Sequence, residues 1–475
     1  METPICSFFF GLTFLLLRLQ FTIAAPVELR VGFKATTSGF TSSSSFSPLL
    51  DDPSGNFSLG FLRLEKEKII LAVVHLPSLQ PLWQPTGGAA LYWTSKTEFL
   101  FNGSIVLSDP DTKSVWSTNT TGDRVVIMNS SNAVVESKGI IVWESFDFPS
   151  NSLVGSQNFT SDMALVSTNG VYSLKLGGDF MAMYAKFGAL KNQIYWKHEA
   201  LQAKARVVPE SGTLYATIKP GGSFNMYQTG TSQPVDILTF NSFNSDATGF
   251  RTVRIESDGN LKGYLWDGGR WLVDYQAISD ICELPSACGN YGLCHPTAGS
   301  GTCSCLDNRT ELVAGQCLGE VSSNNFCSGK KFKVLTIKGV ELPYKELMRT
   351  NVVAAAEECE QICLNDCSCW AALYNNATGR CDFVDYPTQT VLSSGDVGKI
   401  GYFKMGKGQG KTKTGLGVGL GILCFAVVAL VGAVAYAVKN FQAKKSAKRD
   451  TPEPSELEAF PSHFKSPRSE AAAPS

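Results

Sequence analysis

The sequence predicts a mainly β protein in which a cystine-free N-terminal half precedes a cystine-rich region and one membrane-spanning helix. Short apolar segments alternate with turn residues from Val27 to Ile278, and many short strands at this spacing are typical of all-β domains. Twelve of the fourteen cysteines fall between Cys282 and Cys381. Such a cluster becomes a disulfide framework in an oxidising compartment. An uncharged run from Gly415 to Val438 completes the pattern.

Residues 1–24 are expected to be a signal peptide. The apolar core from Ile5 to Leu17 is followed by the small residues Thr22, Ala24 and Ala25. A short apolar core that ends at an A-x-A-like site is typical of a cleaved leader and not of a spanning helix. Cleavage after Ala24 suits the small residues, whereas cleavage after Ala25 would leave Pro26 at the new terminus.

Two β domains are expected in the cystine-free half, over residues 25–160 and 161–280, because a single small β domain seldom reaches 250 residues. The clearest predicted strands are Ile105 to Leu107, Val125 to Ile127, Tyr172 to Leu176 and Thr252 to Ile255.

Two motifs in this half resemble a known family. Val115 to Thr120 (VWSTNT) and Ile141 to Pro149 (IVWESFDFP) are similar to signatures of plant S-domain proteins, which include G-type (bulb-type) lectin receptor-like kinases and S-locus glycoproteins. Gly259-Asn260-Leu261, followed by Trp271 and Cys282, resembles their second repeat. The resemblance implies tandem β-prism (bulb-lectin-like) domains at 25–160 and 161–280.

The resemblance also implies a place to look for carbohydrate binding. Bulb-type lectins bind mannose through a Q-x-D-x-N-x-V-x-Y strand. The best copy here runs from Glu256 to Tyr264 and keeps Asp258, Asn260 and Tyr264, while the stretch from Met128 to Glu136 keeps Asn132 and Val134. The alternative is that Asp258-Gly259-Asn260 is a hairpin turn, since Asp-Gly and Gly-Asn favour turns. We favour the turn, and therefore expect a lectin-like fold with an eroded mannose site.

Residues 281–318 resemble an EGF-like module, with C-G-N-Y-G-L-C from Cys288 to Cys294 as the S-domain version. Six cysteines allow fifteen connectivities. The resemblance implies the pairs Cys282–Cys294, Cys288–Cys303 and Cys305–Cys317. Zinc binding is the rival interpretation of close cysteines, but secretion and the absence of C-x2-C pairs disfavour it. No metal and no cofactor are expected.

Residues 327–404 resemble a PAN/apple domain. Glu357 to Ala372 is similar to the EECxxxCLxNCSCxAY signature, and Ala354 to Leu364 suits a helix on which Cys359 and Cys363 would share one face. The resemblance implies the pairs Cys359–Cys381, Cys363–Cys369 and Cys327–Cys367. PAN domains bind proteins or glycans, and in S-domain receptors this region resembles a dimerisation element.

Residues 415–438 are expected to form a transmembrane helix. A helix of 24 residues is about 36 Å long, enough for a hydrocarbon core of roughly 30 Å. Small residues fall roughly on one face of this helix and would permit close helix association; they are Gly415, Gly419, Ala426, Ala429, Ala433 and Ala437. Residues 439–475 are expected to be a disordered cytoplasmic tail, rich in Pro, Ser and charge. It is too short for a catalytic domain.

Seven N-x-S/T sequons support a single-pass type I topology, because all of them precede the apolar run. Each marks an N-glycosylation site that we expect on the outside of the cell (plasma) membrane. They are Asn56, Asn102, Asn119, Asn129, Asn158, Asn308 and Asn376.

Charge and motif content disfavour two classes of function, nucleic-acid binding and catalysis. The net charge of −1, from 41 basic and 42 acidic residues, gives no reason to expect a nucleic-acid partner. The four histidines lie in no nucleophile or metal motif, so a non-enzyme is expected. A kinase-less, membrane-embedded lectin-like receptor or co-receptor is favoured. It would bind a glycan or peptide ligand and associate with itself or with receptor-like proteins through the PAN domain and membrane helix. The alternative is a structural or adhesive glycoprotein that contacts the cell wall.

Overall fold

The structure is a computed structural model. It describes residues 25–37, 45–65, 68–85, 93–187, 192–199, 212–297, 300–307, 310–318, 326, 332–344 and 348–406. Within these residues the protein is mainly β, and no helix is long and apolar enough to cross a membrane. The predicted signal peptide, transmembrane helix and tail lie outside the described residues.

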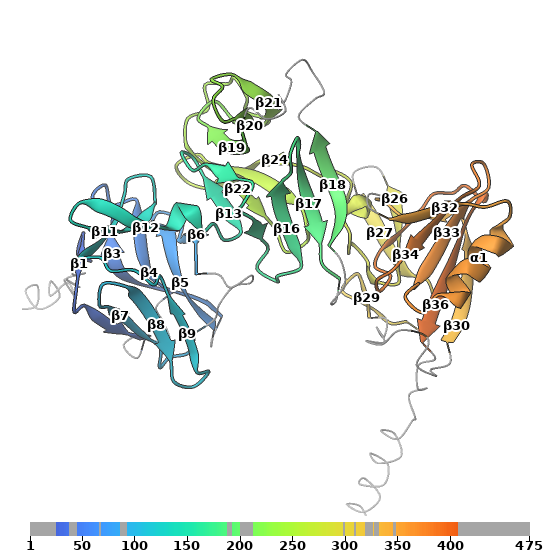
Figure 1. The fold of residues 1–475 in the computed structure, drawn as a ribbon, viewed down its shortest axis with the longest axis horizontal. Coiled ribbons are helices and arrows are strands. Elements are labelled where there is room, and N and C mark those ends of the chain that lie inside the picture. The colour runs from blue at the N-terminus through green and yellow to red at the C-terminus, as the bar shows by residue number, and fades with distance from the viewer. Residues whose placement is uncertain are drawn as a thin grey trace, which may run out of the picture. The chain divides into compact units, whose positions relative to one another are not determined.

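The first half of the chain forms a unit of three four-stranded antiparallel sheets, drawn in blue to cyan in Figure 1. The sheets are, in strand order, β1 (Leu29–Arg30), β10 (Arg124–Ile127), β11 (Ala133–Ser137) and β12 (Ile140–Glu144); β2 (Lys34–Thr36), β7 (Glu98–Phe101), β8 (Ile105–Asp109) and β9 (Ser114–Ser117); and β3 (Phe46–Asp51), β4 (Phe57–Glu65), β5 (Lys68–His75) and β6 (Gln80–Trp83). We call this the first three-sheet unit. Its β12 is followed by a 3-10 turn at Ser145–Asp147.

Alternation of apolar and polar residues builds the core of this unit. Along β8, for example, Ile105 and Leu107 are buried while Val106 and Ser108 are partly exposed, because successive side chains of a strand point to opposite faces. Three tryptophans from three strands, Trp83, Trp116 and Trp143, pack edge to face with ring centroids 5.6–6.3 Å apart. Two of them belong to the motifs that carry the family resemblance.

The next part of the chain repeats the arrangement as a second three-sheet unit. Its sheets are β13 (Ser152–Val154), β22 (Phe250–Ile255), β23 (Leu261–Trp266) and β24 (Trp271–Gln276); β14 (Phe159–Thr160), β19 (Leu214–Lys219), β20 (Ser223–Gln228) and β21 (Pro234–Thr239); and β15 (Leu165–Val166), β16 (Tyr172–Leu176), β17 (Phe180–Ala185) and β18 (Gln193–Glu199). The four strands that the sequence predicts most clearly are all confirmed, as β8 and β10 in the first unit and β16 and β22 in the second. Both units are consistent with the β-prism arrangement.

The cystine-rich region begins with a 3-10 turn at Ile281–Glu283 and contains three sheets. They are β25 (Gly289–Asn290), β29 (Gln316–Leu318) and β28 (Leu312–Val313); β27 (Ser300–Cys305), β26 (Gly292–Thr297), β35 (Val391–Ser393) and β31 (Val340–Glu341); and β30 (Phe332–Lys338), β36 (Lys399–Gly406), β33 (Ala371–Asn375), β34 (Arg380–Val384) and β32 (Arg349–Val352). The helix α1 (Ala356–Asn365) lies against the five-stranded sheet (Figure 1). It begins two residues later and ends one residue later than predicted.

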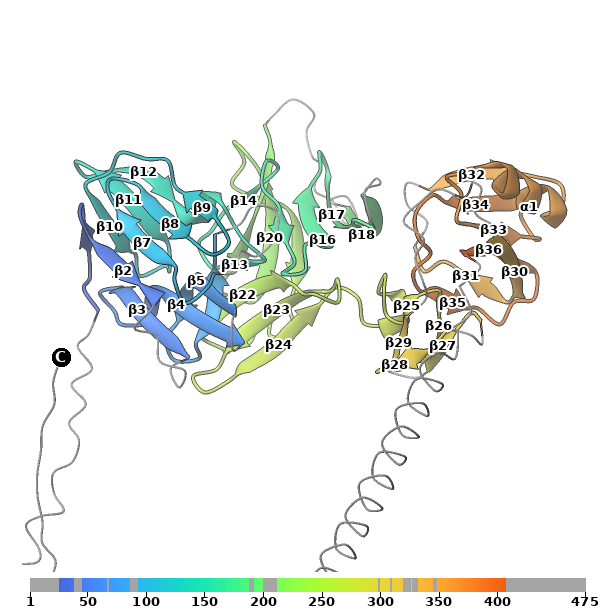
Figure 2. The same ribbon diagram turned by 90° about the horizontal axis from the view of Figure 1, so that it is seen from below.

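One sheet joins the two cystine-rich stretches, residues 281–318 and 327–404, which the sequence predicts as separate modules. Strand β26 pairs in parallel with β35, so Leu293 lies opposite Val391 (Figure 2). Tyr291, from the C-G-N-Y-G-L-C motif, donates its buried hydroxyl to the backbone oxygen of Lys404 over 2.8 Å. Burial raises the pKa of that hydroxyl. The two stretches therefore share backbone hydrogen bonds and a core.

Candidate functional site

The best copy of the lectin pattern, Glu256 to Tyr264, covers the turn between β22 and β23 and the first four residues of β23. The backbone N–H of Glu256 donates to the oxygen of Asn260 over 2.9 Å, and the N–H of Gly259 donates to the oxygen of Glu256 over 3.0 Å. Gly259 has φ +89°, a conformation that glycine adopts without strain. Asp258-Gly259-Asn260 is therefore a tight turn, as the favoured interpretation of the sequence held.

Asn260 is held inside the protein. It is 4% exposed, its side-chain N–H donates to the backbone oxygen of Ile278 over 2.7 Å, and its side-chain oxygen accepts from the N–H of Ile278 over 3.1 Å. A paired amide of this kind fixes the chain where β24 leaves the second unit. Its hydrogen-bonding capacity is largely used within the fold.

The other two residues of this strand lie closer to solvent. Tyr264 donates its hydroxyl to a carboxylate oxygen of Glu256 over 2.6 Å, and the guanidinium of Arg254 lies 4.9 Å from the centre of its ring. Burial, reinforced by Glu256, raises the pKa of Tyr264. Asp258 is exposed and lies 3.4 Å from the ammonium of Lys262. Glu256 and Lys262, the two departures from the lectin pattern, are thus the partners of the residues that conform to it.

The fourth candidate, Asn132, lies in the first unit and has a structural environment of its own. It is 4% exposed. Its side-chain N–H donates to Glu144 over 2.5 Å, and its oxygen accepts from the hydroxyl of Ser145 over 3.0 Å and the N–H of Phe146 over 3.2 Å. The contacts tie the β10–β11 turn to the segment after β12. The structure therefore does not bring the four candidates into one site.

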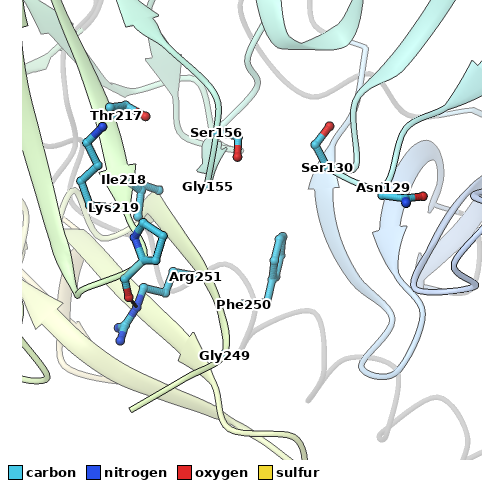
Figure 3. A pocket seen from close by; sticks show the side chains of 11 residues that line it. Asn129, Ser130, Gly155, Ser156, Thr217, Ile218, Lys219, Gly249, Phe250 and Arg251 are labelled. Atoms are coloured by element: carbon cyan, nitrogen blue, oxygen red, sulfur yellow. Dashed lines mark hydrogen bonds between the residues drawn. The ribbon is translucent and has the colours of Figure 1, made fainter. Parts of the chain in front are cut away.

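A cleft of about 350 Å³ opens elsewhere, between the β10–β11 turn of the first unit and three segments of the second. Figure 3 shows Asn129 and Ser130 on one side, Thr217 to Lys219 and Arg251 on the other, and Phe250 between them. The remaining lining comes from Gly155, Ser156, Pro220 and Gly249. Sequence reasoning missed this cleft, because only Asn129 carries a recognisable motif.

Two residues of the cleft wall, Phe250 and Arg251, are held by contacts of different kinds. Phe250 stacks on His75 with ring centroids 5.5 Å and planes 8° apart. Arg251, 3% exposed, pairs with Asp274 and donates to the hydroxyl of Ser242 over 2.8 Å. A buried charge persists only when it is paired and hydrogen-bonded, so the Arg251 guanidinium supports the wall and is not free to bind a ligand.

Six of the seven sequon asparagines lie among the described residues, and all six are exposed. A sugar chain on an asparagine requires an accessible side-chain amide, so each position is sterically suited to modification. The six exposed positions are Asn56, Asn102, Asn119, Asn129, Asn158 and Asn376. The seventh sequon asparagine, Asn308, lies outside the described residues.

Five disulfides join the cysteine pairs that the family resemblance implies. They are Cys282–Cys294, Cys288–Cys303, Cys305–Cys317, Cys359–Cys381 and Cys363–Cys369. Cys367 is also disulfide-bonded, and its expected partner, Cys327, lies outside the described residues.

Among the described residues, one group of potential metal ligands gathers closely: Cys288, Cys294 and Cys303, with sulfurs within 4.8 Å of one another. Each of these sulfurs is in a disulfide, and the thiolate is the form that ligates metal. The group does not fit a zinc site.

Family models match two parts of the chain. The S-locus glycoprotein domain matches residues 210–309 and the PAN domain matches residues 327–404. The PAN domain-containing protein At5g03700 of Arabidopsis thaliana is 48% identical over 428 residues, which cover 89% of this chain and 87% of the relative.

More distant relatives differ in length. EP1-like glycoprotein 4 of Arabidopsis thaliana is 24% identical, and the match covers 84% of this chain and 96% of the relative. The G-type lectin S-receptor-like serine/threonine-protein kinase At5g24080 of the same plant is 25% identical, with 67% of this chain and 42% of the kinase covered. The chain thus spans less than half the length of that kinase.

Proposed function

This chain belongs to the family of plant S-domain proteins that combine an S-locus glycoprotein domain with a PAN domain, and we propose on that premise that it is a lectin-like receptor or co-receptor of the plasma membrane without its own kinase. It would bind an extracellular carbohydrate or protein and act through partner receptors. The observation that carries the proposal is the pair of three-sheet units joined to a disulfide-stabilised region. This arrangement suits binding at a cell surface rather than catalysis.

We propose a ligand other than mannose. A polar sugar site needs each partner group free to bond, because an unpaired buried donor or acceptor costs about 1–3 kcal/mol. Asn132 and Asn260 are engaged within the fold, and Tyr264 is paired with Glu256. The exposed Asp258 and the partly exposed Tyr264 would instead contact a different carbohydrate or protein ligand at the surface.

The topology is part of the same proposal. We place the residues from 25 up to the predicted membrane helix outside the cell, 415–438 in the bilayer and 439–475 in the cytoplasm. Exposed sequon asparagines and disulfides support this placement, since disulfides persist in oxidising compartments. Association through the PAN domain and the membrane helix follows from the resemblance and from the small residues at Gly419 and Ala426.

The decisive experiment combines two measurements on the intact protein, one after purification from plant membranes and one in the cell. A glycan array would detect carbohydrate binding, and crosslinking in living cells would detect partners. A kinase that is crosslinked to this protein only when the ligand is present would support the receptor function. Binding to wall polysaccharide with no receptor partner would instead support the adhesive alternative.

A further inference from the structure

We infer that the cleft between Asn129 and Phe250 is a binding site for the first sugars of an N-glycan carried by Asn129 itself. The glycan would lie between the two three-sheet units as an internal ligand. This inference uses the extracellular topology of the proposed function but does not depend on its receptor role.

The position of Asn129 is the first argument. It lies at the tip of the β10–β11 hairpin, in a turn closed by bonds from the Met128 N–H to the Asn132 oxygen over 2.8 Å and from the Ser131 N–H to the Met128 oxygen over 2.9 Å. Its side chain is exposed and also lines the cleft. A sugar attached to that amide therefore starts at the edge of the cleft.

The chemistry of the walls is the second argument. Ser130, Ser156 and Thr217 present hydroxyls, each of which both donates and accepts hydrogen bonds, as sugar hydroxyls require. Phe250 adds an aromatic surface whose ring is held by its stacking on His75. The lining contains no carboxylate; of its two cations, Arg251 is paired with Asp274, and the ammonium of Lys219 lies 4.7 Å from the centre of the Tyr227 ring. Hydroxyls around one fixed aromatic ring match the hydroxyls and the apolar face of a sugar.

Size and tethering select the occupant. A cleft of about 350 Å³ lies within the roughly 300–1,000 Å³ of small-molecule sites, so it suits one or two sugar rings. A tethered sugar has an effective concentration in the millimolar range for a short linker. A free glycan must instead bear the full entropic cost of association. The attached glycan therefore outcompetes weakly binding free sugars.

The test uses the full chain produced in plant cells, with Asn119 as the matched site. Asn119 is exposed in the same unit but does not line this cleft. The native protein is digested with an endoglycosidase that cuts within the glycan core, and release is followed at each site by mass spectrometry. We expect release at Asn129 to be at least tenfold slower than at Asn119, with the difference lost after denaturation.

A second measurement follows the cleft itself. Hydroxyl-radical labelling of Phe250 should rise at least twofold in Asn129→Gln and stay unchanged in Asn119→Gln. Equal release at the two sites, or an Asn129 without glycan beside a glycosylated Asn119, would overturn the inference and leave the receptor proposal standing. A protein glycosylated at no sequon would overturn the extracellular topology as well.

Discussion

Trp271 donates its indole N–H to the hydroxyl of Ser78 over 3.0 Å, across 193 residues of sequence. The same hydroxyl lies 2.9 Å from Nδ1 of His75. His75 is 4% exposed and is surrounded by the rings of Phe57, Phe250, Trp266 and Trp271 at centroid distances of 5.1–5.9 Å. These contacts join the first three-sheet unit to the second.

We predict that this joint weakens in acid. Burial lowers the pKa of His75, so below about pH 6.5 the unfolded chain binds a proton that the folded protein does not. The free energy of unfolding should therefore fall as the pH drops from 7.5 to 5, by about 1.4 kcal/mol per unit of pKa depression. Thermal unfolding at several pH values measures the loss. It should shrink in His75→Phe and persist in the control His295→Phe; an unaltered pH profile in His75→Phe would contradict the prediction.

Asn260 should matter for stability and not for ligand binding. Asn260→Ala removes both bonds to Ile278 and leaves buried backbone groups unpaired, so we expect a loss of about 1–3 kcal/mol per unpaired group in the free energy of unfolding. Asp258→Ala removes one exposed hydrogen bond, from the Asn260 N–H to the Asp258 carboxylate over 2.8 Å, and should cost about 1 kcal/mol or less. Denaturant titration compares the two variants. A stable Asn260→Ala protein that has lost glycan binding would restore the lectin-site interpretation.

The hydroxyl of Tyr291 should stabilise the contact between the first cystine-rich stretch, residues 282–318, and the PAN domain. Tyr291→Phe keeps the ring but leaves the Lys404 oxygen without this donor, which predicts a loss of about 1 kcal/mol. Hydrogen exchange should then speed up at Leu293 and Val391, where β26 pairs with β35. Tyr215→Phe, in β19 of the second unit, is the control. Unchanged exchange at the β26–β35 ladder would argue that the two stretches are held by other contacts.

Two of the disulfides in the PAN domain should differ in their contribution. Cys359–Cys381 closes a sequence separation of 22 residues and Cys363–Cys369 one of 6. Restriction of the unfolded chain grows with loop length, so removing the longer bridge with paired alanines should cost about 1 kcal/mol more than removing the shorter one. Both pairs are buried, which makes the variants comparable. Equal losses would mean that packing rather than loop closure dominates.

The sequence alone determined the features that depend on short-range order or on covalent spacing. Alternating side chains specify strands such as Tyr172–Leu176 because a strand has a period of two residues. The spacing of Cys359 and Cys363 places both on one face of α1 because a helix repeats every 3.6 residues. The turn at Asp258-Gly259-Asn260 could be predicted because Gly259 adopts a positive φ that few other residues tolerate.

Only the tertiary structure decided which polar residues are available for binding. Asn260 satisfies the lectin pattern by spacing, yet it pairs with Ile278, and Tyr264 pairs with Glu256, because the fold brings these groups within hydrogen-bonding distance. The cleft beside Asn129 and the group of aromatic rings around His75 likewise combine residues from distant segments. Local sequence constrains backbone conformation, whereas burial and hydrogen-bond partners depend on how separate sheets pack, and that packing is where this protein's candidate sites arise.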